Sequence, residues 1–441
     1  MNMKKYSEYK ASDIPWVGDI PSHWNVQRGK NVLTLLDRPI LDTDDVITCF
    51  RDGEVTLRKN RREEGFTLSF QEIGYQGIEP GDLVVHGMDG FAGAIGISDS
   101  RGKATPVLNV MDSLHNKRFL MYYLRTAAYK DVFMSLSTGI RIRSCDLRWN
   151  KLSVFPFILP NRDEQDLIVE YIDDRLSQID SIISETKASI DEYKAWKISI
   201  IYESVTKGLD PNVDKKSSGI EWIGEIPSDW GMKPFKRITI SRDGGSWGEE
   251  PSKQDSETDR ICLRIADFDF DVSRFKKRDV DLYTKRKYSY DQIERLTLQK
   301  GDLLVEKSGG GEKTPVGRLV LFDLEIGALY ANFMDRLRVD TNVVLPEYIA
   351  YYWKAMYHKT VTTAYIKQTI GIQNLNLSSL LEKEYALIPQ ISTQKNIIKH
   401  LDTECKKIDD IILEKNLLVS DLEAYKKSLI FEVVTGKRKV V

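Results

Sequence analysis

The chain has 441 residues, of which 41% are hydrophobic and 29% charged, and its formal net charge at pH 7 is −2. This length predicts about three domains, and the composition excludes a disordered chain. The near-neutral charge excludes a strongly basic nucleic-acid binder, so any attraction for DNA has to come from local patches or from other subunits.

The sequence also limits where the protein works. It contains no apolar run of about 18 residues, no leader-like start, and no CxxC pair among its four cysteines. These features predict a reducing, cytoplasmic location and no contact with a membrane.

The stretch "SDIPWVGDIPSHW" near the start returns as "SSGIEWIGEIPSDW" in the middle of the chain. These opening motifs occupy residues 12–24 and 217–230, and Trp16 and Trp24 align without a gap on Trp222 and Trp230. A dense Trp/Gly/Pro pattern seldom recurs by chance, so it predicts an internal repeat. Because the tryptophans are common to both copies, we expect them to anchor the core rather than to bind a ligand.

The repetition extends along the whole chain. "EPGDLVVHG" matches "QKGDLLVEK", "ILPNRDEQDLIVEYID" matches "LIPQISTQKNIIKHLD", and "AWKISIIYESVT" matches "AYKKSLIFEVVT". The last two pairs are 229 residues apart and the opening motifs 206, so the second copy carries a net 23 extra residues between them. We therefore predict two variable bodies, 1–158 and 209–387, each followed by a constant tail, 159–208 and 388–441.

Both tails run for about 45 residues without Gly or Pro, which predicts long helices. Positions that alternate by four and three are mostly apolar, which is typical of a coiled-coil seam. The seam residues are Ile172, Leu176, Ile179, Ile183, Ile190, Tyr193, Ile200, Leu401, Ile408, Ile412, Val419, Leu422 and Leu429. The polar interruptions also match, with Thr186 and Lys197 aligned on Lys415 and Lys426.

The seam leaves two arrangements open: each helix packs on its own half, or the two helices pair with each other. The shared interruptions favour pairing, and helices joined through a folded body pair most simply antiparallel. The expected fold class is α+β, a tandem duplication of a globular body plus a long helix, with the helices forming an antiparallel coiled coil.

These elements together resemble the specificity subunits of type I restriction–modification systems. The resemblance rests on "WVGDIPSHW" and "EWIGEIPSDW", on "GDLVV" and "GDLLV", on the "LPNRDEQ" and "IPQISTQ" entries to the helices, and on "VTKGLD" and "VTGK" after them. It covers essentially the whole chain and includes the order and the duplication of the motifs.

The resemblance implies that each body reads one half of a split, asymmetric sequence in double-stranded DNA. It implies that the helices fix the separation of the bodies and bind two modification (methyltransferase) subunits, and that motor-nuclease restriction subunits join this complex. It also implies that S-adenosylmethionine, ATP and Mg are bound by the partner subunits.

Basic and amide side chains in the bodies are the candidates for contact with DNA. Lys and Arg neutralise phosphates, Arg pairs with G, and Asn or Gln pairs with A. The candidates are Arg58, Lys59, Arg61, Arg62, Arg141, Arg143, Lys276, Lys277, Arg278, Lys285, Arg286, Lys287, Lys307, Ser308, Lys313, Gln373, Asn374 and Asn376. Two alternatives stay open: the charge runs are solvated faces, and the Asn residues cap a turn.

No catalytic pattern emerges from the sequence. The chain lacks Pro-Pro, and with it the Asn/Asp-Pro-Pro-aromatic motif of adenine methyltransferases, and it has no GxGxxG turn. In "GGGEKT", Glu312 stands where a phosphate-binding loop needs glycine, and the five histidines lack metal-ligand spacing. We therefore expect a non-catalytic chain that binds no cofactor or metal. The alternatives are a two-headed coiled-coil adaptor that binds proteins and half of a fused restriction enzyme.

Overall fold

The structure is a computed structural model that describes residues 5–61, 73–135, 147–251, 257–276, 279–369 and 371–440. The chain forms two compact units, residues 1–187 with 415–441, and residues 188–414. The division falls inside both long helices, α4 (Arg162–Lys207) and α9 (Ile391–Val434). Each unit therefore consists of one body together with part of each helix, whereas the sequence pattern treated the helices as separate segments.

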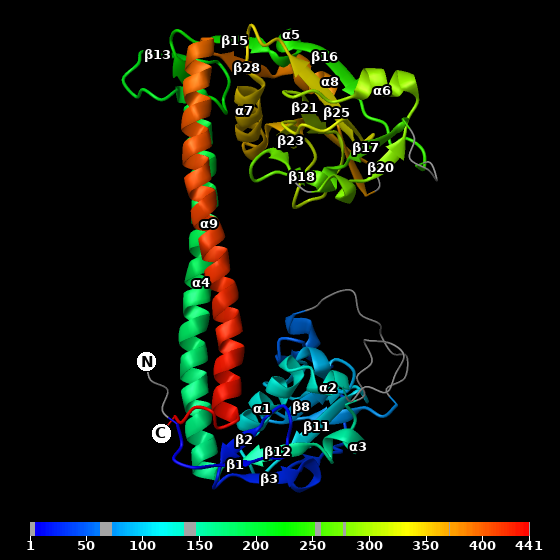
Figure 1. The fold of residues 1–441 in the computed structure, drawn as a ribbon, viewed down its shortest axis with the longest axis vertical. Coiled ribbons are helices and arrows are strands. Elements are labelled where there is room, and N and C mark those ends of the chain that lie inside the picture. The colour runs from blue at the N-terminus through cyan, green and yellow to red at the C-terminus, as the bar shows by residue number, and fades with distance from the viewer. Residues whose placement is uncertain are drawn as a thin grey trace. The chain divides into compact units, whose positions relative to one another are not determined.

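The body of the first unit is built from short antiparallel strands (Figure 1). Its four-stranded sheet has the order β4 (Thr34–Leu35), β11 (Leu108–Asp112), β8 (Leu83–His86) and β9 (Ile95–Ile97). Two-stranded pairs join β1 (Tyr9–Ala11) to β2 (Asp19–Pro21), β3 (Asn25–Arg28) to β12 (Pro156–Leu159), β5 (Ile47–Cys49) to β6 (Val55–Leu57), and β7 (Gln76–Ile78) to β10 (Gly102–Ala104). The helices of this body are α1 (Lys117–Tyr129), α2 (Val132–Ser135) and α3 (Trp149–Leu152).

The body of the second unit has larger sheets. A six-stranded sheet has the order β16 (Thr239–Gly244), β25 (Met334–Val339), β21 (Leu303–Glu306), β23 (Leu319–Leu321), β19 (Arg274–Phe275) and β18 (Phe268–Asp269). One three-stranded sheet has the order β20 (Lys285–Lys287), β17 (Asp259–Leu263) and β24 (Ala328–Tyr330). Another has the order β22 (Ser308–Gly309), β27 (Ile372–Leu375) and β26 (Ile366–Thr369). Two-stranded pairs join β13 (Lys215–Ser217) to β14 (Glu225–Pro227) and β15 (Gly231–Pro234) to β28 (Tyr385–Ile388), and the helices are α5 (Phe235–Ile238), α6 (Tyr290–Leu296), α7 (Pro346–His358) and α8 (Leu377–Lys383).

The two long helices pair with each other in opposite directions. Asp180 on α4 forms an ion pair with Lys426 on α9, and Lys197 on α4 forms one with Asp409 on α9 at 2.6 Å. Residue numbers therefore rise along α4 as they fall along α9, so the helices are antiparallel. The thirteen predicted seam residues are all buried or half-buried. The predicted α+β class and antiparallel coiled coil are confirmed.

The two units repeat the same contacts where body meets helix. Gln165 and Gln394 are fully buried, and their Nε2 groups donate to the carbonyls of Pro160 (2.9 Å) and Pro389 (2.8 Å). Each Oε1 accepts the backbone N–H of the residue that precedes a body helix, Asn116 before α1 and Leu345 before α7. A buried amide that satisfies several backbone groups holds the body against the long helix, because each unmade bond costs about 1–3 kcal/mol.

The tryptophans of the opening motifs lie in the cores of the two units. Trp24 is fully buried and Trp230 is 3% exposed, while Trp16 and Trp222 are half-buried. Trp16 packs on Tyr123 with ring centroids 5.2 Å apart, as Trp222 packs on Tyr352 at 5.6 Å. These residues lie among core side chains, which is the position that the duplication predicts.

A glycine follows each long helix and ends it in a left-handed conformation, with φ of +78° at Gly208 and +71° at Gly436. A Cβ atom at Gly436 would overlap the Pro21 ring, whereas at Gly208 it would lie 3.2 Å from the nearest Trp230 atom. We expect Gly436→Ala to lower the free energy of unfolding by about 3 kcal/mol and Gly208→Ala by only about 1 kcal/mol. Urea unfolding of the full chain measures both, and equal losses would contradict this account.

Candidate nucleic-acid interface

The basic cluster of the first body is largely balanced by carboxylates. Lys59 forms an ion pair with Asp45 at 2.6 Å, and Arg61 reaches Asp52 and Glu54, both at 2.7 Å. Burial would raise the pKa of Asp52, but hydrogen bonds from the Glu54 amide and from Arg61 keep it below its ordinary value. Because these carboxylates balance the charges of Lys59 and Arg61, little net positive charge remains on this part of the surface. Both side chains are nevertheless exposed and accessible to a phosphate.

The neighbouring candidate, Arg58, donates to the Thr48 hydroxyl at 3.3 Å. The remaining candidates of the first body, Arg62, Arg141 and Arg143, lie outside the described residues, as do Lys277 and Arg278 of the second body.

The basic run of the second body forms the short strand β20, in which alternate side chains point to opposite faces. Lys285 and Lys287 are exposed, whereas the Arg286 side chain is 13% exposed and pairs with Glu250. The Arg286 guanidinium lies 4.3 Å from the ring centroid of Trp247, which is itself 38% exposed. Arg286 therefore supports an exposed aromatic ring, an arrangement that the basic run alone does not reveal.

Strands β26 and β27 form a hairpin that carries exposed polar side chains, with Lys367 and Asn374 on one face and Gln368 on the other. Lys367 lies opposite Asn374 and Gln368 opposite Gln373, and Gly371, at φ +77°, occupies the turn. Lys367, Gln368 and Asn374 are exposed, and the Ser308 hydroxyl orients the Asn374 amide at 2.7 Å. We call these three residues the amide ribbon.

The other two amides of the same segment have structural partners. Gln373 is 8% exposed, and its Oε1 accepts the Val316 backbone N–H at 3.2 Å. Asn376 is the N-cap of α8 and accepts the Ser379 N–H at 3.2 Å. The capping alternative therefore describes Asn376, and of the three amides only Asn374 belongs to the exposed face.

The candidate lysines in the loops differ in whether their side chains are held by a partner or exposed. Lys307 forms an ion pair with the buried Asp335 at 2.7 Å, and Lys313 is exposed. Lys276 is also exposed, and its ammonium donates to the Ala266 carbonyl at 3.0 Å. Strand β22 covers Ser308 and Gly309, and no helix begins in residues 309–345. A phosphate-binding loop that leads into a helix is therefore not present in this described stretch.

The chain resembles known proteins in sequence and in fold. The chain is 22% identical over 377 residues to the type I restriction enzyme EcoBI specificity subunit of Escherichia coli, covering 82% of this chain and 74% of that protein. It is 21% identical over 451 residues to the StySPI specificity subunit of Salmonella potsdam, covering 95% and 90%. A chain from a structure on complex assembly and conformational transition of the type I R-M system matches with a TM-score of 0.68 at 10% identity, covering 94% and 98%.

The chain is similar to type I restriction–modification specificity subunits in sequence and in fold. No protein-family model matches it, so the assignment rests on these relatives and on the order and duplication of its motifs. The predicted resemblance is confirmed.

Two exposed residues of the β26–β27 hairpin, Lys367 and Gln368, were missed by reasoning from the sequence. They precede Asn374 by six and seven residues, and only the register of the hairpin brings them beside it. The signal was the glycine at position 371 between two short polar-apolar runs, which is typical of a hairpin turn.

Within the described residues, no group of three or more His, Cys, Asp or Glu side chains is placed to hold a metal ion. None of the helices in the described part of the chain combines the length and apolar character of a membrane span.

Proposed function

We propose that this chain is a specificity subunit that reads a split, asymmetric sequence in double-stranded DNA, one half-site with each body, and that it does so in the cytoplasm. Its paired helices hold two modification (methyltransferase) subunits, and motor-nuclease subunits join them to restrict unmodified DNA. The chain supplies recognition and no chemistry, so S-adenosylmethionine, ATP and Mg are bound by the partners.

The observation that supports this proposal is one scaffold carrying two different surfaces. Gln165 and Gln394 fasten body to helix in the same way in both units. The segments before the two helices, by contrast, share a Gly-Ile frame but exchange their polar residues, with Arg141 and Arg143 in one and Asn374 in the other. Two readers of different base sequences need this combination, because Arg favours G and Asn favours A.

The amide ribbon is suited to this role. A two-stranded ribbon fits the major groove of B-DNA, where each base pair presents a distinct pattern of donors and acceptors. Asn374 offers an amide to base edges, and Lys367, on the same face of the hairpin, offers a charge to a phosphate, while Gln368 lies on the opposite face.

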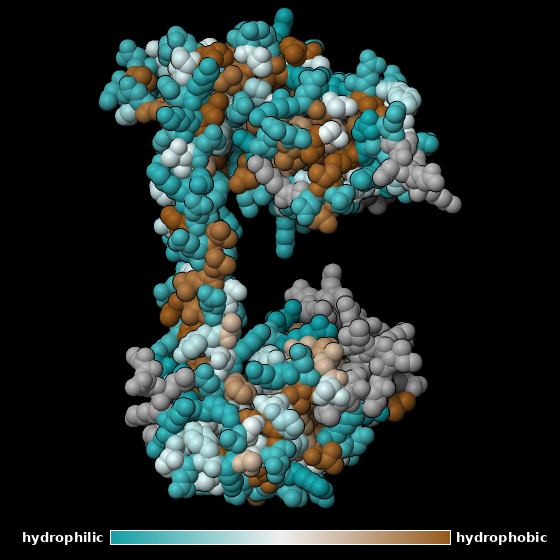
Figure 2. Space-filling view, in the orientation of Figure 1, coloured by the Kyte–Doolittle hydropathy of each residue, from teal (hydrophilic) through white to brown (hydrophobic). Residues whose placement is uncertain are grey.

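The helices carry equivalent exposed aromatic residues that suit two copies of one partner. Trp196 on α4 and Tyr425 on α9 are 229 residues apart and are 52% and 46% exposed. Figure 2 shows hydrophobic surface along the helices, and α9 also exposes Leu413 and Leu417. Exposed aromatic residues are typical anchors of protein interfaces, and a duplicated scaffold offers the same anchor twice.

The experiment that tests the function is modification-sensitive sequencing of genomic DNA from host cells with the gene intact and deleted. We expect deletion to remove methylated adenines at one gapped motif, which would reveal both half-sites. Unchanged methylation, together with capture of unrelated proteins by the two bodies, would instead support the protein-binding adaptor.

In the same assay, we expect Asn374→Ala to relax base preference at one position of one half-site. The loss corresponds to about 1–3 kcal/mol, or roughly five- to 150-fold in discrimination, because a bidentate amide contact is removed. Asn376→Ala is the matched control. It removes a helix cap, so it lowers stability by about 1 kcal/mol and leaves the motif unchanged. A relaxed motif in both variants would show that the ribbon has no direct role.

A further inference from the structure

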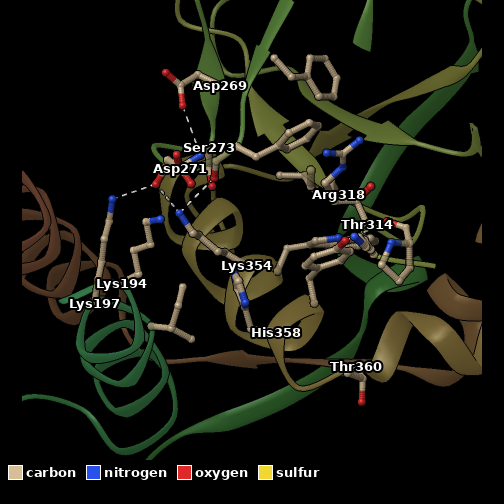
Figure 3. Close-up of a pocket in the computed structure, with 18 of the residues that line it drawn as sticks. Lys194, Lys197, Asp269, Asp271, Ser273, Thr314, Arg318, Lys354, His358 and Thr360 are labelled. Atoms are coloured by element: carbon tan, nitrogen blue, oxygen red, sulfur yellow. Dashed lines mark hydrogen bonds between the residues drawn. The ribbon is translucent and has the colours of Figure 1, made fainter. Parts of the chain in front are cut away.

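The second unit contains a pocket of about 820 Å³ where its body meets the long helices. Side chains from α4, α7 and α9 line it, together with the loops around residues 268–276 and 313–319. Figure 3 shows Lys194 and Lys197 extending from α4 toward Lys354 on α7, with Asp271 between them. Variable body and constant scaffold therefore contribute to one site.

Positive charge predominates in this pocket. Six of the described lining residues are Lys or Arg and three are Asp. The charge of Lys197 is balanced by Asp409, because its ammonium lies 2.6 and 2.7 Å from the two Asp409 oxygens. The same ammonium donates to the Asp271 carbonyl at 2.8 Å. Within the described residues, Lys354 donates its hydrogen bonds to two backbone carbonyls, those of Phe270 (3.1 Å) and Asp271.

The charged form of Lys354 is destabilised by its surroundings. Burial, and next the neighbouring charge of Lys197, lower the pKa of Lys354 to about 8. A cation that is partly desolvated without a carboxylate bonded to it is stabilised when a ligand brings negative charge. The pocket therefore favours an anion.

Three exposed lysines surround the opening, and each comes from a different element. Lys194 lies on α4, Lys276 in the loop after β19, and Lys313 in the loop after β22. The nearest carboxylate to Lys194 is the exposed Asp191, at 3.5 Å on the same helix. All three residues are exposed, so their ammonium groups can bind phosphate.

We propose that this pocket binds backbone phosphates of the DNA, at the edge of the half-site that faces the unread gap. The inference rests on the proposed function, in which the body reads bases and the helices span the gap. The spacer helix α4 then contacts DNA itself, through Lys194. Lysine is a compact point charge that suits phosphate without reading the base sequence.

The test compares the double variant Lys194→Ala/Lys313→Ala with the wild-type chain, each assembled with its modification subunits. DNA affinity is measured from low to high salt, on cognate DNA and on DNA with one half-site altered. Each phosphate contact contributes about 0.9 to the slope of log affinity against log salt. We therefore expect the slope to fall by about 1.8 and affinity to drop roughly 10- to 100-fold on both DNAs, with their ratio unchanged.

A matched control removes the same charge elsewhere in the unit. Lys300 and Lys383 are exposed and do not line the pocket, so Lys300→Ala/Lys383→Ala is expected to leave the slope as it is. Methylphosphonate groups at the gap-side phosphates should weaken binding by the wild type but not by the Lys194/Lys313 variant.

The outcomes separate the two proposals. If the wild type prefers cognate DNA and the variant keeps the same slope, the phosphate site is wrong while the proposed function stands. If AMP or inorganic phosphate binds the pocket in the absence of DNA and the slope is unchanged, the ligand is a free phosphate compound and the inference is overturned. If the wild type shows no preference for any gapped sequence, both proposals fail.

Discussion

Replacing Lys197 by methionine is expected to lower the stability of the 188–414 unit by about 3–5 kcal/mol, the usual cost of breaking a buried ion pair. The Lys197 side chain is only 7% exposed, and its ammonium bonds both Asp409 oxygens and the Asp271 carbonyl. Removing it leaves the Asp409 carboxylate at the helix interface without its donor, which accounts for the large cost, whereas the Asp271 carbonyl still accepts from Lys354.

The chain provides its own control for this change. Lys426 and Asp180 are the duplicate of Lys197 and Asp409, each 229 residues away, but their side chains are 22% and 56% exposed. Water screens this pair, so Lys426→Met is expected to cost less than about 1 kcal/mol. Hydrogen exchange measured by mass spectrometry assigns each loss to its unit, through α7 and residues 391–414 or through α1 and residues 415–434.

The double variant Lys197→Met/Asp409→Leu completes the comparison. Two apolar side chains of similar size replace the pair without leaving a lone charge, so most of the lost stability should return. Equal losses for Lys197→Met and Lys426→Met, or no recovery in the double variant, would show that burial of the pair does not determine its strength.

The same pairs show what could be predicted from the sequence. The seam has a period of 3.5 residues, which depends only on local spacing, and the matching interruptions at Lys197 and Lys426 were visible in the alignment. Their partners, Asp180 and Asp409, were not predicted, because they lie on the opposite helix and depend on the register of pairing. Pattern predicts helices and their contact face, but not which residues meet across it.

The candidate site shows the same limit at shorter range. Gln373, Asn374 and Asn376 are equally polar in the sequence, yet one is buried, one exposed and one caps a helix. Strand pairing and the start of α8 decide between these roles, and both depend on neighbours elsewhere in the chain. Charge runs are equally ambiguous, since Arg61 is paired with Asp52 and Glu54.

Lys354→Met is expected to change how the stability of the same unit depends on pH. The folded pKa of Lys354 is about 8, below the value of about 10.5 for an unfolded lysine. Between these values the unfolded chain binds more protons, so wild-type stability gains with rising pH, and below pH 8 the charged lysine imposes a constant cost. Methionine has no such proton, so the variant lacks this contribution at every pH.

The measurement is the difference in unfolding free energy between wild type and Lys354→Met at pH 7 and pH 9.5. From the two pKa values, that difference should move in favour of the wild type by about 2 kcal/mol over this range. Taking the difference cancels the contributions of the tyrosines and cysteines, which titrate in both proteins. The hydrogen bonds lost at the Phe270 and Asp271 carbonyls lower the unfolding free energy of the variant by the same amount at both pH values. Lys359→Met, an exposed lysine just beyond α7, should show no such change. A pH-independent difference for Lys354→Met would mean that Lys354 titrates as an ordinary exposed lysine, and it would remove the electrostatic support for an anion in the pocket.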